Sequence, residues 1–365
     1  MKQQEARWLG HLRELVNMES PTGDGEGNLT VLKYLNTHLQ QLGESSITGP
    51  PHSPVLMIGG SDSSYQLVVG HADTVWPRGT LNRRPFQIQD QKVYGPGVFD
   101  MKASFSNLIL AIEALAHFDL KPSLPIGVVV NSDEETGSLD SRDAIRRRAE
   151  HARRVWVLEP SLGAHGALKI TRRGVMRFQL HGQGKAAHSG MDPEKGINAI
   201  LALSRLLVEI HALEEPGLNI NLGLISGGVA ANVVAPTAHA TVEARTTTLA
   251  QMDKVARWLS DMCQGPGLPS FRYTMDVQIP PMETRADQLQ LLEQVVHLGQ
   301  QLGLSLEAGH SGGASDANTT CQVAPTIDGL GAVGDGAHAS HEHVCIKASL
   351  SRAALLSLAF CLPSL

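Results

Sequence analysis

The sequence predicts an α/β fold in which helices flank a mostly parallel sheet, with a smaller α+β unit inserted into it. Short apolar runs bounded by turn residues alternate with stretches of helical periodicity, the pattern of a parallel sheet covered by helices. The chain has 365 residues, more than one hydrophobic core usually serves. The alternation of apolar runs and helical stretches gives way to an amphipathic run near Thr171 and returns after Pro280. We therefore expect one domain from residues 1–172 and 280–365, and a second from residues 173–279.

Two helices are expected at the start of the first domain. Ser20-Pro21-Thr22 ends the first helix, and Gly43 is expected to be a left-handed C-cap of the second. The apolar residues that define each helix lie three or four positions apart: Trp8, Leu12, Leu15 and Val16 in the first, and Leu32, Leu35, Leu39 and Leu42 in the second.

The strands of the first domain are predicted from short apolar runs. Four runs have the length of a buried strand and are bounded by turn residues. They are Val55–Ile58, Leu67–Val69, Ile126–Val130 and Val155–Leu158.

The inserted unit begins with an amphipathic run, Val175–Leu180. A long helix is expected next, with apolar residues at Ile197, Ile200, Leu201, Leu207 and Ile210. The remaining elements of this α+β unit are expected at Leu222–Ile225, Ala240–Ala244, Val255–Met262 and Phe271–Val277.

Composition indicates a globular protein. Hydrophobic residues make up 42% of the chain and charged residues 18%, and the formal net charge of −6 argues against a nucleic-acid partner. No apolar run has membrane-spanning length, and the N-terminus lacks the apolar segment of a signal peptide. The four widely spaced cysteines are expected to be free thiols and not metal ligands. These features predict a cytoplasmic protein with no membrane partner.

Acids and histidines gather where predicted strands end. His71 and Asp73 follow one strand, Glu134 and Glu135 another, and Glu159 a third. Ligands of open α/β sheets bind at the carboxyl ends of strands, and imidazoles with carboxylates suit zinc or a similar divalent ion. A single His-x-Asp or Glu-Glu pair is more often a turn or a solvated charge pair. Three such strand ends together favour a metal site.

These segments also carry a family resemblance. The motifs are GHADTV, YGPGVFDMK, NSDEETGS, LEP, GKAAHSGMDPEKGINAI, SGGASDA and GAHASHE. In order and spacing they resemble those of the dizinc exopeptidases and deacylases that include glutamate carboxypeptidase, acetylornithine deacetylase and succinyl-diaminopimelate desuccinylase. The resemblance covers nearly the whole chain and is strongest to glutamate carboxypeptidase-like members. It implies a zinc exopeptidase-like catalytic domain and a ferredoxin-like lid and dimerisation domain.

The resemblance implies a role for each residue of a site with two Zn²⁺ ions, for which Co²⁺ or Mn²⁺ could substitute. Glu134 would be the general base for a hydroxide shared by the metals, and Asp73 would accept a hydrogen bond from His71. Asp100 would bridge the two metals, with Glu135 and His338 completing one site and His71 and Glu159 the other.

The resemblance also assigns residues in the inserted domain. His188 would stabilise the oxyanion and, in a homodimer, reach the active site of the other subunit. Arg245 would bind the terminal carboxylate of the substrate, and Asn232, Gly312 and Gly313 would contact the substrate. For each of these residues, an ordinary position in a turn or at a strand end is the alternative.

Two positions depart from the family pattern. Ala103 and Ser104 follow Lys102 where the family has two glycines, so we expect the turn at the start of this helix to pack differently. Ala167 occupies the position of a lysine that holds the glutamate side chain in bacterial glutamate carboxypeptidase. Lys169, Arg172 or Arg173 are the candidates to replace it, and the sequence leaves the preferred side chain open.

The function expected is metal-dependent hydrolysis of a peptide or N-acyl amino acid at the amide bond next to a free C-terminal carboxylate. Two alternatives stand beside it. One is a dizinc aminopeptidase or dipeptidase that recognises a substrate amine, against which Arg245 argues. The other is a catalytically silent binding protein of the same fold, against which Glu134 argues.

Overall fold

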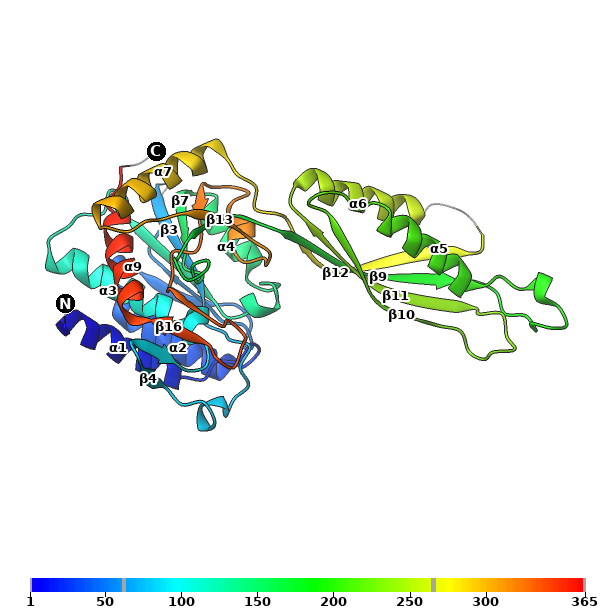
Figure 1. Ribbon diagram of the computed structural model, residues 1–365, viewed down its shortest axis with the longest axis horizontal. Coiled ribbons are helices and arrows are strands. Elements are labelled where there is room, and N and C mark those ends of the chain that lie inside the picture. The colour runs from blue at the N-terminus through cyan, green and yellow to red at the C-terminus, as the bar shows by residue number, and fades with distance from the viewer. Residues whose placement is uncertain (1, 61–63, 264–266, 364–365) are drawn as a thin grey trace. The chain divides into compact units, whose positions relative to one another are not determined.

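The computed structural model describes residues 2–60, 64–263 and 267–363, which form two compact units (Figure 1). The first unit consists of Met1–Thr171, Thr284–Ser311 and Ser315–Leu365. The second consists of Arg172–Glu283 and Gly312–Ala314. Each has its own hydrophobic core.

A mixed, mostly parallel sheet lies at the centre of the first unit. Its strand order is β1-β2-β6-β3-β7-β14, and the β6-β3, β3-β7 and β7-β14 pairs are parallel. Every residue of β3 and β6 is buried, as expected for strands covered on both faces. All four strands predicted for this domain are confirmed. The bounds are β1 Ser45–Thr48, β2 Val55–Ile58, β3 Tyr65–His71, β6 Ile126–Asn131, β7 Ala152–Val157 and β14 Thr326–Ile327.

Helices pack around this sheet. The most buried is α3, which is apolar on nearly all sides and contacts α1, α2 and α9 (Figure 1). The predicted core residues of the first helix, Trp8, Leu12, Leu15 and Val16, are all buried. The helix bounds are α1 Lys2–Asn17, α2 Gly25–Leu39, α3 Ala103–His117, α4 Arg142–Ala149, α7 Ala286–Gln301, α8 Ala317–Thr320 and α9 Ile346–Ala359.

Two small sheets complete the first unit. One has the order β15-β16-β5-β4, and the other pairs β13 with β8. The bounds are β4 Gln87–Gln89, β5 Lys92–Tyr94, β8 Leu168–Arg172, β13 Ala308–Ser311, β15 Gly334–Asp335 and β16 His343–Cys345.

The end of α2 differs from the prediction. The helix ends at Leu39, and the 3₁₀ turn Gln40–Leu42 follows it. Gly43 has φ +134° and ψ −167°, so it is not the left-handed C-cap that we expected. A Cβ at this residue would lie 3.3 Å from the Cα of Gly59. The positive φ and the close approach of the Gly59 backbone therefore both favour glycine at this position.

The second unit is an antiparallel sheet of order β10-β11-β9-β12 with α5 and α6 packed against it. Residues along β11 alternate between buried and more exposed, as expected when one face of a sheet is covered. The predicted elements of the unit are all present. Their bounds are β9 Gly174–Gln183, α5 Ala199–His211, β10 Asn219–Gly227, β11 Thr237–Thr246, α6 Leu249–Met262 and β12 Ser270–Ile279.

The α5 helix is shorter than predicted and turns part of its apolar surface outward. Ile197 lies before the helix and pairs with Lys185 in an isolated bridge. Ile200 and Leu201 are 37% and 52% exposed and so lie outside the core that we expected them to join. The helix buries Leu203, Leu207 and Ile210 instead.

The described residues contain no helix with the length and apolar content that a membrane span requires. All four cysteines are free thiols, as predicted.

Candidate active site

The first unit brings together six acids and histidines at one edge of its main sheet. His71 ends β3, Glu134 and Glu135 lie in a short turn after β6, and Glu159 follows β7. Because β6, β3 and β7 are parallel, their carboxyl ends meet at this edge. The six side chains form two groups whose possible ligand atoms lie within 4.8 Å of one another: His71, Glu134 and Glu159, and Asp100, Glu135 and His338.

Asp100 lies between two imidazoles. Its Oδ1 atom is 3.2 Å from Nε2 of His71, and its Oδ2 atom is 3.5 Å from Nε2 of His338. Each oxygen of one carboxylate therefore faces a different histidine, the geometry required of a carboxylate that bridges two cations.

The donor set fits divalent cations. Oε2 of Glu135 is 2.9 Å from Nε2 of His338, whereas its Oε1 atom is buried and has no hydrogen-bond partner within the described part of the chain. Glu159 lies 3.5 Å from Nε2 of His71 and 3.8 Å from Nζ of Lys169. A buried carboxylate oxygen without a partner is costly, and a cation bound beside it removes that cost.

Burial and close contacts between the acids and histidines of the site shift their pKa values. Burial raises the pKa of Glu134 well above its ordinary value, and the neighbouring Glu159 adds to the increase. Burial opposes ionisation of Asp100, but hydrogen bonds with His338 and His71 outweigh it and hold its pKa below the ordinary value. Hydrogen bonds with Asp100 and Glu135 raise the pKa of His338 to about 10. The carboxylates of Asp100 and Glu135 thus favour a positive charge beside them.

Asp73 contacts more than the histidine we expected it to orient. Nδ1 of His71 lies 3.0 Å from the carbonyl oxygen of Asp73 and 3.5 Å from its carboxylate. The carboxylate accepts hydrogen bonds from the backbone N–H groups of Glu134, at 3.3 Å, and Glu135, at 3.2 Å. Thr22 Oγ1 donates a third, at 2.7 Å. Asp73 therefore connects His71 to the turn that carries both glutamates.

Glu342 is a fully buried acid for which we predicted no role from the sequence. Its carboxylate accepts hydrogen bonds from the backbone N–H groups of Gly97, Phe99 and Asp100. Burial raises the pKa of Glu342 to about 6 against the hydrogen bonds, which lower it. An acid four residues after His338, in a glycine-containing loop, was the available sequence signal.

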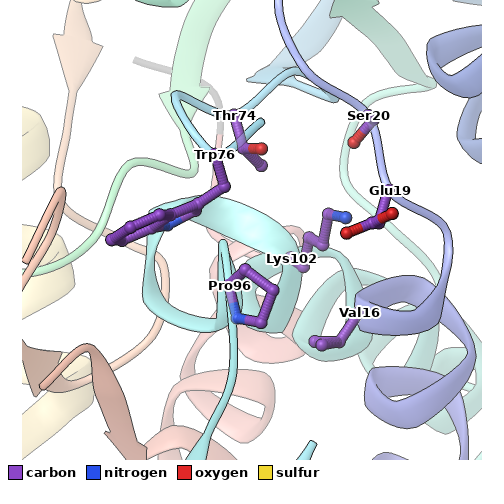
Figure 2. Close-up of a pocket in the computed structure, with 7 residues that line it drawn as sticks. All are labelled: Val16, Glu19, Ser20, Thr74, Trp76, Pro96 and Lys102. Carbon is purple, nitrogen blue, oxygen red and sulfur yellow. The ribbon is translucent and has the colours of Figure 1, made fainter. Parts of the chain in front are cut away.

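A small pocket lies beside the turn that carries Asp100 (Figure 2). Lys102 is buried there, and Figure 2 shows its ammonium group directed toward the carboxylate of Glu19. Its Nζ donates a hydrogen bond of 2.6 Å to the carbonyl oxygen of Met18, and burial lowers its pKa to about 7. Lys102 thus fastens the turn to the end of α1.

Ser104, at the position of the second family glycine, is accommodated at the start of α3 by its neighbours. The residue is fully buried, and its Oγ accepts a hydrogen bond of 3.2 Å from the N–H of Ala332. A Cβ at Gly331 would lie 2.1 Å from this Oγ and 2.6 Å from the carbonyl oxygen of Glu159. The serine side chain therefore occupies space that the adjacent Gly331 leaves open.

The remaining predicted residues belong to the second unit, which the structure describes separately. His188 is exposed, and its Nδ1 accepts hydrogen bonds of 3.1 Å from the N–H groups of Gly190 and Met191. This pattern assigns the ring proton to Nε2, which is then a donor. The carbonyl oxygen of Asn232 accepts a hydrogen bond of 3.0 Å from the N–H of Ser189, which joins the loop of Asn232 to the loop of His188.

Arg245 and the two glycines have different surroundings within that unit. Nε of Arg245 donates to Glu243 at 2.8 Å, and Glu243 also binds Arg177. The carbonyl oxygen of Gly313 accepts a hydrogen bond of 3.0 Å from Nη1 of Arg172. Gly312 and Gly313 have open space where a Cβ would lie, so neither is a glycine for steric reasons.

Comparison with known proteins identifies the family. The model of peptidase family M20/M25/M40 matches residues 67–361. Carboxypeptidase G2 of a Pseudomonas species is 28% identical over 355 residues, covering 92% of this chain and 84% of that protein. Succinyl-diaminopimelate desuccinylase of Ralstonia pickettii is 26% identical over 366 residues, covering 92% of this chain and 93% of that protein.

Solved structures share the fold. Aminopeptidase PepT from Bacillus cereus has a TM-score of 0.78 at 21% identity, over 98% of each chain. An M20 family metallo-carboxypeptidase from Sulfolobus solfataricus has a TM-score of 0.72 at 17% identity, over 97% of this chain and 99% of that chain. The resemblance inferred from the motifs is confirmed: the chain belongs to peptidase family M20/M25/M40 and is a metal-dependent hydrolytic enzyme.

Proposed function

We propose that this enzyme hydrolyses the amide bond of a peptide or N-acyl amino acid next to a free C-terminal carboxylate, with two divalent cations in the acidic cluster. The observation that carries the proposal is the placement of Asp100, with one carboxylate oxygen facing His71 and the other facing His338. The imidazole and carboxylate donors suit Zn²⁺, and Co²⁺ and Mn²⁺ are the alternatives.

Each metal would have its own residues and share Asp100. His71 and Glu159 would hold one ion, and Glu135 and His338 the other. Bound cations would polarise the scissile carbonyl and lower the pKa of the attacking water. Asp73 would keep the His71 ring in place through its carbonyl oxygen and hold the Glu134–Glu135 turn through its carboxylate.

Glu134 would act as the general base. Its carboxylate lies in the group with His71 and Glu159, and burial raises its pKa well above the ordinary value. A base whose pKa lies closer to neutrality accepts a proton more effectively. Glu134 would take the proton of the attacking water and return it to the leaving amine.

The second unit would supply the groups that recognise the substrate. Nε2–H of His188 would donate to the oxygen that gains negative charge during attack. Glu243 engages Nε of Arg245, which leaves the terminal nitrogens of the guanidinium for a bidentate contact with the substrate carboxylate. Asn232, Gly312 and Gly313 would contact the rest of the substrate.

A homodimer through the second unit is part of the proposal. The edge strand β10 exposes Leu222, Leu224 and Ile225, and α5 exposes Leu201 and Val208. An exposed apolar edge strand is suited to pairing with a second copy. Mixing inactive Glu134→Ala and His188→Ala subunits is expected to restore activity if His188 acts across the dimer, and no recovery would contradict that arrangement.

Glu134→Gln tests the chemistry. We expect the purified variant to keep the metal content of the wild type and to lose about 10² to 10⁴ in turnover. Metal content is the important measurement because Glu134 lies close enough to His71 and Glu159 to be a ligand itself. Glu150→Gln, at an exposed glutamate paired with Arg146, is the control and is expected to be fully active.

The substrate class is tested with matched dipeptides. We expect an N-blocked dipeptide with a free carboxylate to be cleaved faster than its C-amidated counterpart with a free amine. The opposite preference would replace the proposal with an aminopeptidase. If the wild type hydrolyses neither substrate with Zn²⁺, Co²⁺ or Mn²⁺, the proposed reaction is refuted.

A further inference from the structure

The Glu342 carboxylate is fully buried and meets four N–H donors. Its Oε1 accepts the backbone N–H groups of Phe99, at 2.9 Å, and Asp100, at 3.2 Å. Its Oε2 accepts the backbone N–H of Gly97, at 2.9 Å, and the indole N–H of Trp76, at 2.7 Å. A carboxylate has about four lone-pair sites, so these donors use its full capacity.

Three of these donors belong to one turn, which carries the bridging residue of the proposed site. Backbone N–H groups at the start of a helical segment have no partner within it, and N–H groups that converge on one point form a binding site for an anion. Here the anion is a side chain of the same protein. The N–H of Asp100 itself is among the donors, so Glu342 fixes the backbone from which the Asp100 side chain extends.

The same residue also closes the loop that carries His338. The N–H of Glu342 donates to the carbonyl oxygen of Ala339, at 3.0 Å, and the N–H of Ala339 donates to Gly336, at 2.9 Å. Gly336 has φ +83°, and a Cβ there would lie 2.9 Å from the backbone of Glu342. The backbone of Glu342 therefore shapes the His338 loop while its side chain holds the Asp100 turn.

A third contact ties both segments to the loop after β3. The guanidinium of Arg84 lies 4.3 Å from the centre of the Trp76 ring, whose N–H binds Glu342. Nη2 of Arg84 also donates to the carbonyl oxygen of Ala339, at 3.4 Å. Trp76, Glu342, Ala339 and Arg84 thus form a closed ring of contacts around the two ligand-bearing segments.

We infer that Glu342 is a positioning residue that sets Asp100 and His338 at the spacing needed to share a cation. The inference rests on the proposed function, because it assumes that these two residues bind metal. Glu342 would contact neither metal nor substrate. It would act through the backbone N–H of Asp100 on one side and the loop of His338 on the other.

Glu342→Gln tests this role in the full-length protein. An amide retains one acceptor oxygen and places an NH₂ group against two of the four donors, whichever way it is oriented. We expect the affinity of the metal-depleted variant for Zn²⁺, measured by competition with a chromogenic chelator, to fall about 10-fold to 100-fold. Turnover should recover as the Zn²⁺ concentration is raised, with KM close to that of the wild type.

Asp287→Asn is the control. Asp287 accepts the backbone N–H of Gln288 at 2.8 Å and binds the guanidinium of Arg285, at the start of α7 and in a segment without proposed ligands. Both variants should lower the melting temperature of the metal-free protein, but only Glu342→Gln should weaken Zn²⁺ binding. Equal Zn²⁺ affinities for the two variants would overturn the inference, because a purely structural role predicts that result.

Trp76→Phe provides a second test if Glu342→Gln does not fold. It removes one donor and leaves the carboxylate with its three backbone contacts. We expect the Zn²⁺ affinity to fall by about threefold or more, and an unchanged affinity would count against the inference. If the wild-type protein binds no Zn²⁺, the proposed function is refuted. If the wild type binds two ions and these variants bind them with unchanged affinity, only the role of Glu342 is refuted.

Discussion

Asp73→Asn is expected to weaken both the fold and metal binding, because this carboxylate holds the turn that carries Glu134 and Glu135. The side chain is fully buried, and its Oδ2 accepts hydrogen bonds from Glu135 N, at 3.2 Å, and Thr22 Oγ1, at 2.7 Å. Its Oδ1 accepts the N–H of Glu134, at 3.3 Å. The amide would keep the most contacts by placing its oxygen at the Oδ2 position.

That orientation still turns an NH₂ group toward the N–H of Glu134. One buried N–H without a partner costs about 1–3 kcal/mol, and the turn can relieve this only by moving Glu134 away. The NH₂ would also replace the oxygen that lies 3.5 Å from Nδ1 of His71. Changes to a residue that supports metal ligands typically reduce metal affinity about 10-fold to 100-fold.

Two measurements check this prediction. Urea unfolding of the metal-free protein gives the loss of stability, and a Zn²⁺ titration gives the loss of affinity. A variant with the wild-type urea midpoint and the wild-type Zn²⁺ affinity would refute the reasoning from the Asp73 contacts.

Asp133→Asn is the matched control for Asp73. The Asp133 carboxylate also accepts two backbone N–H groups, those of Asp140 and Ser141, and the hydroxyl of Ser141. Both N–H groups bind the same oxygen, and the hydroxyl can reverse its role to accept from an amide. Asparagine should therefore be tolerated better here, with no change in Zn²⁺ affinity.

Two further predictions concern residues near the site. Gly331→Ala should destabilise the protein by about 1–3 kcal/mol or more in urea unfolding, because the new Cβ would lie 2.2 Å from the carbonyl oxygen of Leu158. Gly10→Ala is the control, since Gly10 has open space in α1, and it should be neutral or stabilising. Similar losses of stability for the two variants would contradict the steric argument. Burial raises the pKa of Asp316 from 3.8 to about 7, so the folded state binds the proton more tightly and this group makes the protein less stable as pH rises between these values. Asp316→Asn should therefore flatten the fall in melting temperature of the metal-free protein over that pH range. Parallel profiles for the wild type and the variant would refute this prediction.

The strand ends explain which site residues the sequence alone could indicate. His71, Glu134, Glu135 and Glu159 follow directly from apolar runs, and parallel strands bring such positions to one edge without any knowledge of tertiary contacts. The helical and strand periodicities likewise predicted the first two helices and four strands of the first unit, and the helices and strands of the second. Burial of individual helix residues was harder to predict: Leu201 shares the apolar pattern of α5 but is 52% exposed.

Asp100 and His338 could not be placed by the same reasoning. Neither directly follows a strand of the main sheet, and only the family resemblance indicated their roles. The Asp100 turn takes its conformation in part from Glu342, which lies 242 residues away in the sequence. A contact of that separation leaves no periodic pattern. The carboxylate contacts of Asp73 with the Glu134–Glu135 turn, 61 and 62 residues away, went unpredicted for the same reason.

The buried acids around the site differ in what they bind, and this difference separates structural from chemical roles. Asp73 and Glu342 accept several backbone N–H groups, which fix the positions of their carboxylates. Among the described residues, the side chains of Asp100, Glu134 and Glu135 accept no backbone N–H, and one oxygen of Glu135 has no partner. Acids without backbone partners remain available to cations and protons. The neighbouring acids with backbone partners supply the rigidity that such a site requires.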